Sequence, residues 1–177
     1  LPVVGPQIYE SPDSFSYPTQ EVWRDTVGFA LVTPICVYDI DQDGKPEIVK
    51  VLGDYTHLEI YESVGDNQYS NICSITTAAT HNSSSTLAFG DFDLDEKNEF
   101  VWGYSGGEYS IFECIGNNSY QEIAFQEIPI PCGIKDGFTV PDADGDGKLE
   151  FVLAGYVLFD VNVYTFIYEA TGDKTYA

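Results

Sequence analysis

The chain has 177 residues, with 29 acidic residues against 7 lysines and arginines and a formal net charge of -22. This balance offers nothing to neutralise phosphates, which excludes nucleic acid and anionic membrane surfaces as partners and leaves multivalent cations as the natural counter-charge. The hydrophobic fraction of 44% and the aromatic fraction of 15% indicate one folded domain with a sizeable core rather than a disordered chain.

The N-terminal sequence LPVVGPQIYE and the absence of methionine indicate a mature chain whose signal peptide has been removed, and hence an extracellular or cell-surface protein. No run of about 18 apolar residues is present, so we expect no membrane span. Four cysteines, at positions 36, 73, 114 and 132, are too far apart in the sequence for a CxxC metal site. Up to two disulfides or buried free thiols would both fit this number and spacing.

Three acidic segments divide the chain into repeats. DIDQDGKPE begins at Asp39, DFDLDEKNE at Asp91 and DADGDGKLE at Asp142, so the first aspartates lie 52 and 51 residues apart. Each segment leads into an apolar run and then into a second run that ends in an aromatic residue and a glutamate: LEIYE, YSIFE and TFIYE. A period near 50 residues is typical of a propeller or another repeat array.

The predicted elements are all strands. In chain order they begin with QIYE and YPTQEVWRDTV, a half repeat, and continue in the first full repeat with FALVTPICVYD, PEIVKVLG, HLEIYES and QYSNICSITT. Val, Ile, Tyr, Phe and Thr dominate, and no segment shows helical periodicity. We therefore predict an all-β, β-propeller-type array of four-stranded antiparallel blades, about three blades plus a half blade. The predicted single domain 1–177 consists of a half blade (1–30), two blades (31–80 and 81–131) and a blade that lacks its last strand (132–177).

The acidic segments place carboxylates at positions 1, 3 and 5 of a tight loop between the first and second strands, where all can turn toward one ion. Glycine at position 6 permits the sharp turn. Such oxygen-rich loops suit calcium, with its about six to eight oxygen ligands, better than magnesium, and the absence of nearby His or Cys argues against zinc. The last acid stands at position 9 rather than position 12, so the loops are not EF-hands.

The pattern D-x-D-x-D-G-x-x-E followed by a strand resembles the FG-GAP/VCBS repeat, and FGDFDLDEKNEF at 89–100 retains the FGD start of that pattern. The resemblance extends over nearly the whole chain and implies propeller blades that bind about three calcium ions through loop side chains and the backbone carbonyl at position 7. The implied ligands are Asp39, Asp41, Asp43, Lys45 and Glu47; Asp91, Asp93, Asp95, Lys97 and Glu99; and Asp142, Asp144, Asp146, Lys148 and Glu150.

The second loop departs from this pattern because Glu96 stands where glycine belongs. A non-glycine residue at this position is strained or forces another turn, so we expect the Asp91 site to be the weakest or to be remodelled. The glutamates at position 9 are longer than the usual aspartate and are expected to bind through water or bidentately.

Three blades and a fraction are too few for a closed ring, so the chain is either a piece of a longer propeller or a unit whose edges are covered by assembly. Residues 17–27 correspond to a fourth strand, and the chain ends where the fourth strand of its last blade should begin. We therefore expect strand exchange between chains, which gives a homo-oligomer, a ring or a filament. The expected function is that of an extracellular calcium-binding structural or adhesion protein.

No catalytic set is evident, since His57, expected in a hairpin turn, and His81, expected in a polar connector, have no nucleophile in a known motif beside them; we expect no enzyme. The alternatives are a calcium-dependent lectin and a surface propeller that binds a protein ligand. The lectin would stack sugars on aromatic side chains, which could instead pack between blades. These aromatic residues are Trp23, Trp102, Tyr104 and Tyr156.

Overall fold

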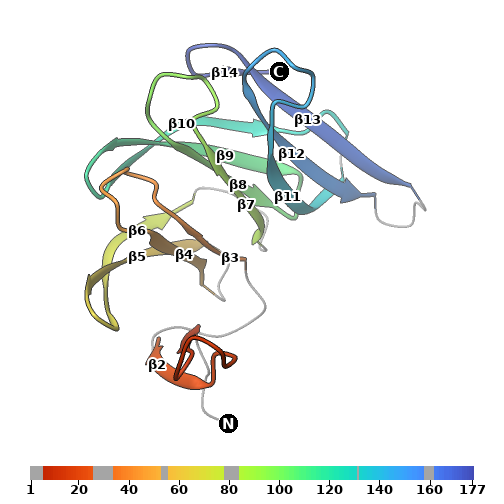
Figure 1. Cartoon of the computed structure of the whole chain (residues 1–177). Coiled ribbons are helices and arrows are strands. Elements are labelled where there is room, and N and C mark those ends of the chain that lie inside the picture. The colour runs from red at the N-terminus through yellow and green to blue at the C-terminus, as the bar shows by residue number, and fades with distance from the viewer. Residues whose placement is uncertain (1–5, 26–33, 53–55, 78–83, 131, 158–161) are drawn as a thin grey trace.

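The computed structural model describes residues 6–25, 34–52, 56–77, 84–130, 132–157 and 162–177. In these ranges the chain forms antiparallel strands and no helix, arranged as one two-stranded hairpin and three four-stranded sheets. The sheets follow one another along an open arc, with the N-terminal hairpin at one end and the last sheet at the other (Figure 1). The predicted all-β fold class, an open blade-like array, is confirmed.

The strands have the following bounds. The N-terminal hairpin pairs β1 (Gln7–Glu10) with β2 (Gln20–Arg24). Blade 1 contains β3 (Ile35–Tyr38), β4 (Glu47–Val51), β5 (His57–Gly65) and β6 (Gln68–Thr76). Blade 2 contains β7 (Ser84–Gly90), β8 (Glu99–Tyr104), β9 (Glu108–Gly116) and β10 (Ser119–Glu127). Blade 3 contains β11 (Gly133–Pro141), β12 (Leu149–Tyr156), β13 (Val163–Gly172) and β14 (Thr175–Tyr176).

The order of strands within a blade follows from their burial. Every residue of β4 and β8, the second strands of blades 1 and 2, is buried, because each sheet is covered on both faces by its neighbours. The fourth strands β6 and β10 share one pattern in which exposed residues predominate, as expected at the outer edge of a blade. The apolar runs behind the acidic loops are therefore inner strands, and the Ser- and Gln-rich strands are outer ones.

Aromatic side chains at equivalent repeat positions fill the space between blades. Phe100 of β8 stacks on Phe112 at 4.9 Å between ring centroids, and Phe89 stacks on Tyr38 of blade 1 at 5.4 Å. One repeat later, Phe151 stacks on Tyr168 at 5.0 Å and meets Phe92 of blade 2 edge to face at 5.3 Å. The two hydrophobic clusters thus lie between blades 1 and 2 and between blades 2 and 3.

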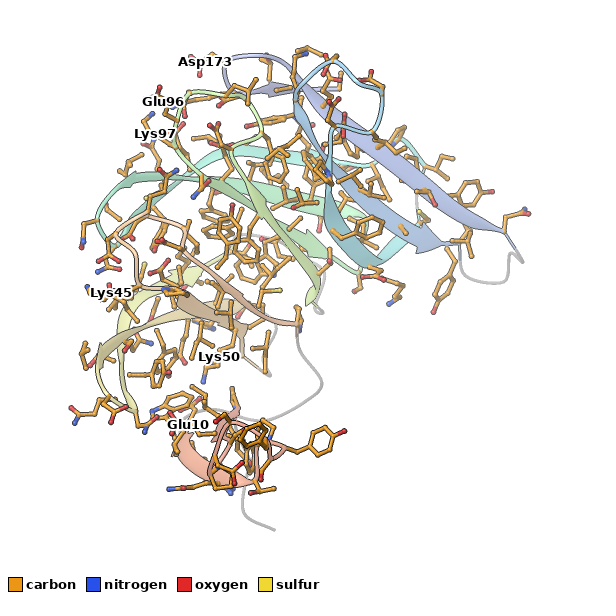
Figure 2. All side chains as sticks on the ribbon, in the orientation of Figure 1. Glu10, Lys45, Lys50, Glu96, Lys97 and Asp173 are labelled. Atoms are coloured by element: carbon orange, nitrogen blue, oxygen red, sulfur yellow. The ribbon has the colours of Figure 1, made fainter. Side chains whose placement is uncertain are left out.

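The N-terminal hairpin packs on the outer face of blade 1. The Trp23 ring lies 5.7 Å from that of Tyr61 and 5.2 Å from that of Tyr69. Lys50, which is buried, forms ion pairs with Asp25 and, at 2.9 Å, with Glu59. Figure 2 shows Lys50 pointing from blade 1 toward this hairpin. The hairpin thus occupies the place of a preceding blade of which it forms only two strands.

Two strands at the ends of the array differ from their equivalents. Glu62 of β5 faces Ser70, eight residues later, whereas Glu10 of β1 faces Gln20, ten residues later, so the hairpin loop is two residues longer in register. At the other end, β14 has only two residues, where the sequence predicted a blade without its last strand. Neither terminal unit therefore forms a full blade.

The four cysteines are free. Cys36 and Cys73 lie in the same row of blade 1, but β4 and β5 stand between their strands. Three strand spacings amount to about 14 Å, which is far beyond the reach of a disulfide. Cys114 and Cys132 are buried. Of the two alternatives from the sequence, free thiols on and beside strands describe the structure.

We predict that the junction between blades 1 and 2 contributes much of the stability. Replacement of the fully buried ring in Phe100→Ala should lower the free energy of unfolding by about 3–5 kcal/mol. The matched change Phe125→Ala, at a ring that is 48% exposed, should cost about 1 kcal/mol or less. Denaturant unfolding followed by tryptophan fluorescence measures both. Equal losses in the two variants would contradict this role of the junction.

Candidate metal centres

Three groups of four carboxylates form the candidate sites. Within each group one oxygen of every side chain lies within 4.8 Å of one oxygen of each of the others. All twelve acidic residues expected from the sequence take part. Site 1 contains Asp39, Asp41, Asp43 and Glu47; site 2 contains Asp91, Asp93, Asp95 and Glu99; site 3 contains Asp142, Asp144, Asp146 and Glu150.

Hydrogen bonds from the backbone fix the aspartates of each loop. In site 1 the Gly44 N–H donates to Asp39 Oδ2 (3.1 Å between N and O), and the Lys45 N–H donates to Asp43 Oδ1 (2.9 Å). Site 2 repeats both bonds, and site 3 repeats the second. These bonds hold one oxygen of a carboxylate toward the loop backbone, so the aspartates are oriented before any ion binds.

Left-handed backbone at positions 4 and 6 gives all three loops one shape. At position 6, Gly44 and Gly147 have φ of 89° and 93°, and Glu96 adopts the same region with φ of 71°. Of the two expected consequences, strain or another turn, the structure shows the first: the loop keeps its shape, at a strain of order 1–3 kcal/mol at most. Gln42 and Leu94 at position 4 also have positive φ, 60° and 62°, which could not be expected from the sequence because neither is glycine.

The position-9 glutamates have the surroundings that best fit a bound cation. In site 1, Glu47 Oε2 accepts the N–H of Ile40 at 2.6 Å, and Glu99 and Glu150 accept the N–H at position 2 of their own loops at 2.8 Å. The three glutamates are at most 2% exposed, and in each the other oxygen, Oε1, has no hydrogen-bond partner among the described residues. An unpaired buried carboxylate oxygen is costly, so each loop orients an acceptor toward a partner that protein groups do not supply.

Burial also changes the acidity of these glutamates. It raises the pKa of Glu47 to about 7 and that of Glu99 to about 8, and the charges of the neighbouring aspartates add to the rise. A cation between the carboxylates would have the opposite effect, because it favours their charged form. The donors are all oxygens, and a hard divalent cation such as calcium fits them. The residues present therefore suit the ion that the sequence pattern implies.

A lysine bridge links each loop to the third strand of its own blade. Lys45 Nζ lies 2.8 Å from Asp43 and 2.8 Å from Glu62 at the end of the LEIYE run. Lys97 joins Asp95 to Glu113 and Lys148 joins Asp146 to Glu169 in the same way. From the sequence we assigned these lysines only a backbone carbonyl, and that contribution stays a prediction. The glutamate of the recurring aromatic-Glu dipeptide was the sequence feature from which an ion pair with the lysine side chain could have been predicted.

The next blade covers sites 1 and 2 through a hairpin turn. At site 1 the N–H of Asn118, in the β9–β10 turn, donates to Asp41 Oδ2 at 2.9 Å, and its side-chain amide donates to Glu62 at 2.8 Å. At site 2 the N–H of Lys174, in the β13–β14 turn, donates to Asp93 Oδ2 at 2.9 Å. Lys174 Nζ also lies 2.8 Å from Glu113. The loops thus hold neighbouring blades together as well as their own strands.

Figure 2 shows this junction at site 2. Asp173, which precedes Lys174 in the turn of blade 3, lies on the same side of the molecule as Glu96 and Lys97 of the loop in blade 2 (Figure 2). A tyrosine with a buried hydroxyl oxygen accompanies each turn: Tyr120, which is half-buried, near site 1 and Tyr176, which is buried, near site 2. The pKa of both hydroxyls is raised, first by burial and then by the carboxylates of the adjacent site. Neither hydroxyl has a hydrogen-bond partner within the described chain.

Site 3 is the open member of the set. Its three aspartates are exposed, whereas those of site 2 are all half-buried, and in site 1 Asp39 and Asp41 are half-buried while Asp43 is exposed. Within the described residues no turn of another blade donates to Asp144, the equivalent of Asp41 and Asp93. The order of burial among the loops therefore follows the presence of a following blade rather than the loop sequence, and site 2, expected to be the weakest, is the most enclosed by burial.

The aromatic residues considered for sugar binding mostly serve packing. Trp102 and Tyr104 are fully buried between blades 1 and 2, and Trp23 is half-buried against blade 1. Tyr156 is 43% exposed and has Lys135 Nζ 5.8 Å from its ring centroid. His57 is the first residue of β5 rather than a turn residue, and His81 lies outside the described residues. Of these four aromatic side chains, all in described parts of the chain, Tyr156 alone is exposed.

Fold and sites together define a class of protein, an open array of propeller blades with an oxygen-rich cation loop between the first and second strands. A family model, the FG-GAP-like repeat, matches residues 39–102, from the first aspartate of site 1 into β8. The resemblance predicted from the sequence is thereby confirmed over this span. No curated protein matched the chain. Within the described ranges no helix could cross a membrane.

The raised pKa values predict that the calcium-free protein loses stability as the pH rises. The folded pKa of Glu47 (about 7) and that of Glu99 (about 8) exceed the ordinary value of 4.5, so between these limits the folded state holds more protons than the unfolded state. The free energy of unfolding must then fall with rising pH, by roughly 1–3 kcal/mol between pH 5.5 and 8. Urea unfolding in calcium-depleted buffer measures this profile.

The variant Glu99→Gln provides the control for this profile. It removes the group with the highest of these pKa values, so the profile should flatten mainly above about pH 7. A wild-type stability that stays constant or increases over the same interval would contradict the burial of these carboxylates without a cation.

Proposed function

We propose that the chain is an extracellular calcium-binding structural or adhesion protein, without enzymatic activity, in which calcium in the three loops fixes the blades and fastens each to the next. The observation that carries the proposal is the buried glutamate of each loop, whose Oε1 has no hydrogen-bond partner among the described residues and which lies with three aspartates in a group of oxygens within 4.8 Å. Calcium would supply positive charge and coordination to these oxygens.

The role of each residue type follows from the geometry. The aspartates at positions 1, 3 and 5 and the glutamate at position 9 hold the ion, and the lysine at position 7 partly balances the charge at the rim of the site. At sites 1 and 2 the position-3 aspartate also accepts a hydrogen bond from a backbone N–H in the turn of the next blade. An ion bound to this carboxylate therefore stiffens the junction between the two blades. Calcium binding and blade docking are thus coupled.

The proposal includes self-association through the terminal strands, into a ring or a filament. Two features support it. β14 pairs with β13 at Ala170 and Gly172, and Ala177 exchanges backbone hydrogen bonds with Glu169, so the outer edge of β13 from Val163 to Tyr168 carries no strand in the described part of the chain. At the other end, β2 lies in the position of a fourth strand beside a partner, β1, of only four residues. An open strand edge is a template for a strand from another chain.

Calcium titration tests the proposal. Isothermal titration calorimetry should detect about three ions per chain, one for each group of carboxylates. Glu99→Gln should remove or weaken by about tenfold or more one of these binding events, since it takes a charged ligand from site 2. The same change should raise the stability of the calcium-free protein at pH 8, by roughly 1–3 kcal/mol, because it removes a buried charge that lacks a partner.

The opposite signs of the two effects separate a ligand from a merely structural residue, whose replacement would lower stability under both conditions. Asp66→Asn is the matched control, because Asp66 is an exposed turn aspartate outside the three groups, and the change should alter neither calcium binding nor stability. A wild-type chain that binds no calcium at millimolar concentration would refute the proposal.

A further inference from the structure

At the C-terminal end of the array, the first-strand and third-strand members of a row are exposed although their equivalents in blade 2 are buried, while the second-strand member, Val152, is 4% exposed. Strand register places Cys36, Val49 and Ile60 in one row of blade 1, and Ala88, Val101 and Ile111 in the same row of blade 2. The equivalent row of blade 3 is Phe138, Val152 and Ile167. The following blade covers this row in blades 1 and 2, where Ile60 and Ile111 are 0% exposed. Ile167 is 60% exposed and Phe138 is 52% exposed.

The N-terminal end exposes the complementary face. Val37 of β3 and Phe89 of β7 each stand two residues before the first aspartate of their loop. Phe89 is 8% exposed because it packs on blade 1, whereas Val37 is 63% exposed. The N-terminal hairpin covers Tyr61 and Tyr69 of blade 1 through Trp23 but does not bury β3. A preceding blade would need its first and second strands to cover β3, and the hairpin supplies only a third and a fourth.

The polar groups that join neighbouring blades, a left-handed turn and an acidic loop, are also present at the two ends of the array, one at each end. Asn67, in the β5–β6 turn, has φ of 57°, the conformation of Asn118 (54°) and Lys174 (53°), the turn residues that cover sites 1 and 2. At the other end, site 3 presents Asp144 and Glu169, the equivalents of Asp41 and Glu62, which receive the turn of blade 2. The described chain therefore contains one blade-docking turn without a loop and one loop without a turn.

We infer that two copies of the chain close a six-bladed ring in which blade 3 of each copy packs on blade 1 of the other. Each copy has three four-stranded sheets, and two copies therefore supply a number of blades within the range of about four to eight found in propellers. Each copy has one end of each kind, so a ring of two contains two identical junctions and no open end. The inference deepens the self-association proposed above and rests on it.

Strand exchange completes the blade at each junction. In the ring, the β2 strand of one copy can pair with only one third strand of a blade. Its own β1 and the β13 of the other copy therefore compete for this position. β13 has ten residues and β1 has four, and the β1–β2 pair has a loop two residues longer than the equivalent hairpin of blade 1. β1 therefore separates from β2, and β2 continues the fourth strand of the partner's blade 3 beyond the two-residue β14, along the open edge of β13. The open arc of Figure 1 is then half of the closed propeller.

The sequence of the internal junctions suggests a sharp test at Asn67. Lys174, the residue at the equivalent turn position, forms an ion pair with Glu113, the equivalent of Glu169. Asn67→Lys should therefore strengthen the ring through an ion pair with Glu169 of the partner subunit, and Asn67→Glu should weaken it by about tenfold or more in dissociation constant through repulsion. Ile167→Glu should abolish it. Gln121→Lys and Gln121→Glu, at an exposed position of β10, are the matched charge controls.

Sedimentation velocity in calcium, over a range of concentrations, measures the outcome. The expected species has twice the chain mass of 19.6 kDa, and it responds in opposite directions to the two changes at Asn67 but not to those at Gln121. Hydrogen exchange should show protected β13 amides only in this species. A dimer whose dissociation constant does not change with the substitutions at Asn67 and Ile167 uses another surface and overturns the inference. A chain that stays monomeric at about 100 μM overturns it as well.

Calcium binding, measured in the same samples, separates this inference from the proposed function. A chain that binds calcium but stays monomeric refutes the ring and the self-association and leaves the calcium sites intact. Open-ended polymers refute ring closure while they support self-association. A dimer that forms equally in chelator and is lost in Ile167→Glu supports the ring and contradicts the coupling of calcium to blade docking.

Discussion

The concentration of negative charge in each acidic loop is the constraint on which the rest of the structure depends. Four carboxylates within 4.8 Å of one another repel strongly, by several kcal/mol for each close pair even at an effective dielectric constant of about 20. The position-7 lysine offsets one charge and the loop N–H groups stabilise others, but the buried glutamate at position 9 lies deepest and keeps one oxygen without a protein partner in the described chain. A loop of this kind is stable when a cation completes it.

The same carboxylates determine how the blades follow one another. The position-3 aspartate accepts the backbone N–H of the next blade's turn, and the third-strand glutamate that receives the lysine bridge also receives the side chain of that turn. One set of acids thus organises three elements: the loop, its own third strand and the neighbouring hairpin. The aromatic layers between blades add nonpolar contact area, while these polar contacts fix the register in which one sheet meets the next.

Much of the fold and of the candidate sites could be predicted from the sequence because the same residue pattern occurs three times in the chain. The period, the strand content and the twelve acidic residues required only local patterns, which carry strand alternation and turn chemistry directly. The sequence was less informative where geometry depends on contacts between repeats. The left-handed Gln42 and Leu94 are held by the loop as a whole, and the bridge from Lys45 to Glu62 and the cap from Asn118 join residues far apart in the chain. The expected weakness of the Asp91 site considered Glu96 alone and overlooked the blade that covers it.

Repetition also explains why the two ends of the array are informative. At an internal junction the nonpolar row, the acidic loop and the left-handed turn always occur together, so the burial of any one predicts the other two. At the C-terminal end, the row and the loop of blade 3 receive no turn from another blade in the described chain, and at the N-terminal end the turn of blade 1 meets no loop of another blade there. In an isolated chain the exposed nonpolar side chains of the row and the charged carboxylates of the site 3 loop both face water. Because the loop with the most exposed carboxylates belongs to the incomplete junction, the charge that a bound cation would neutralise and the surface that a neighbouring blade would cover lie in the same place.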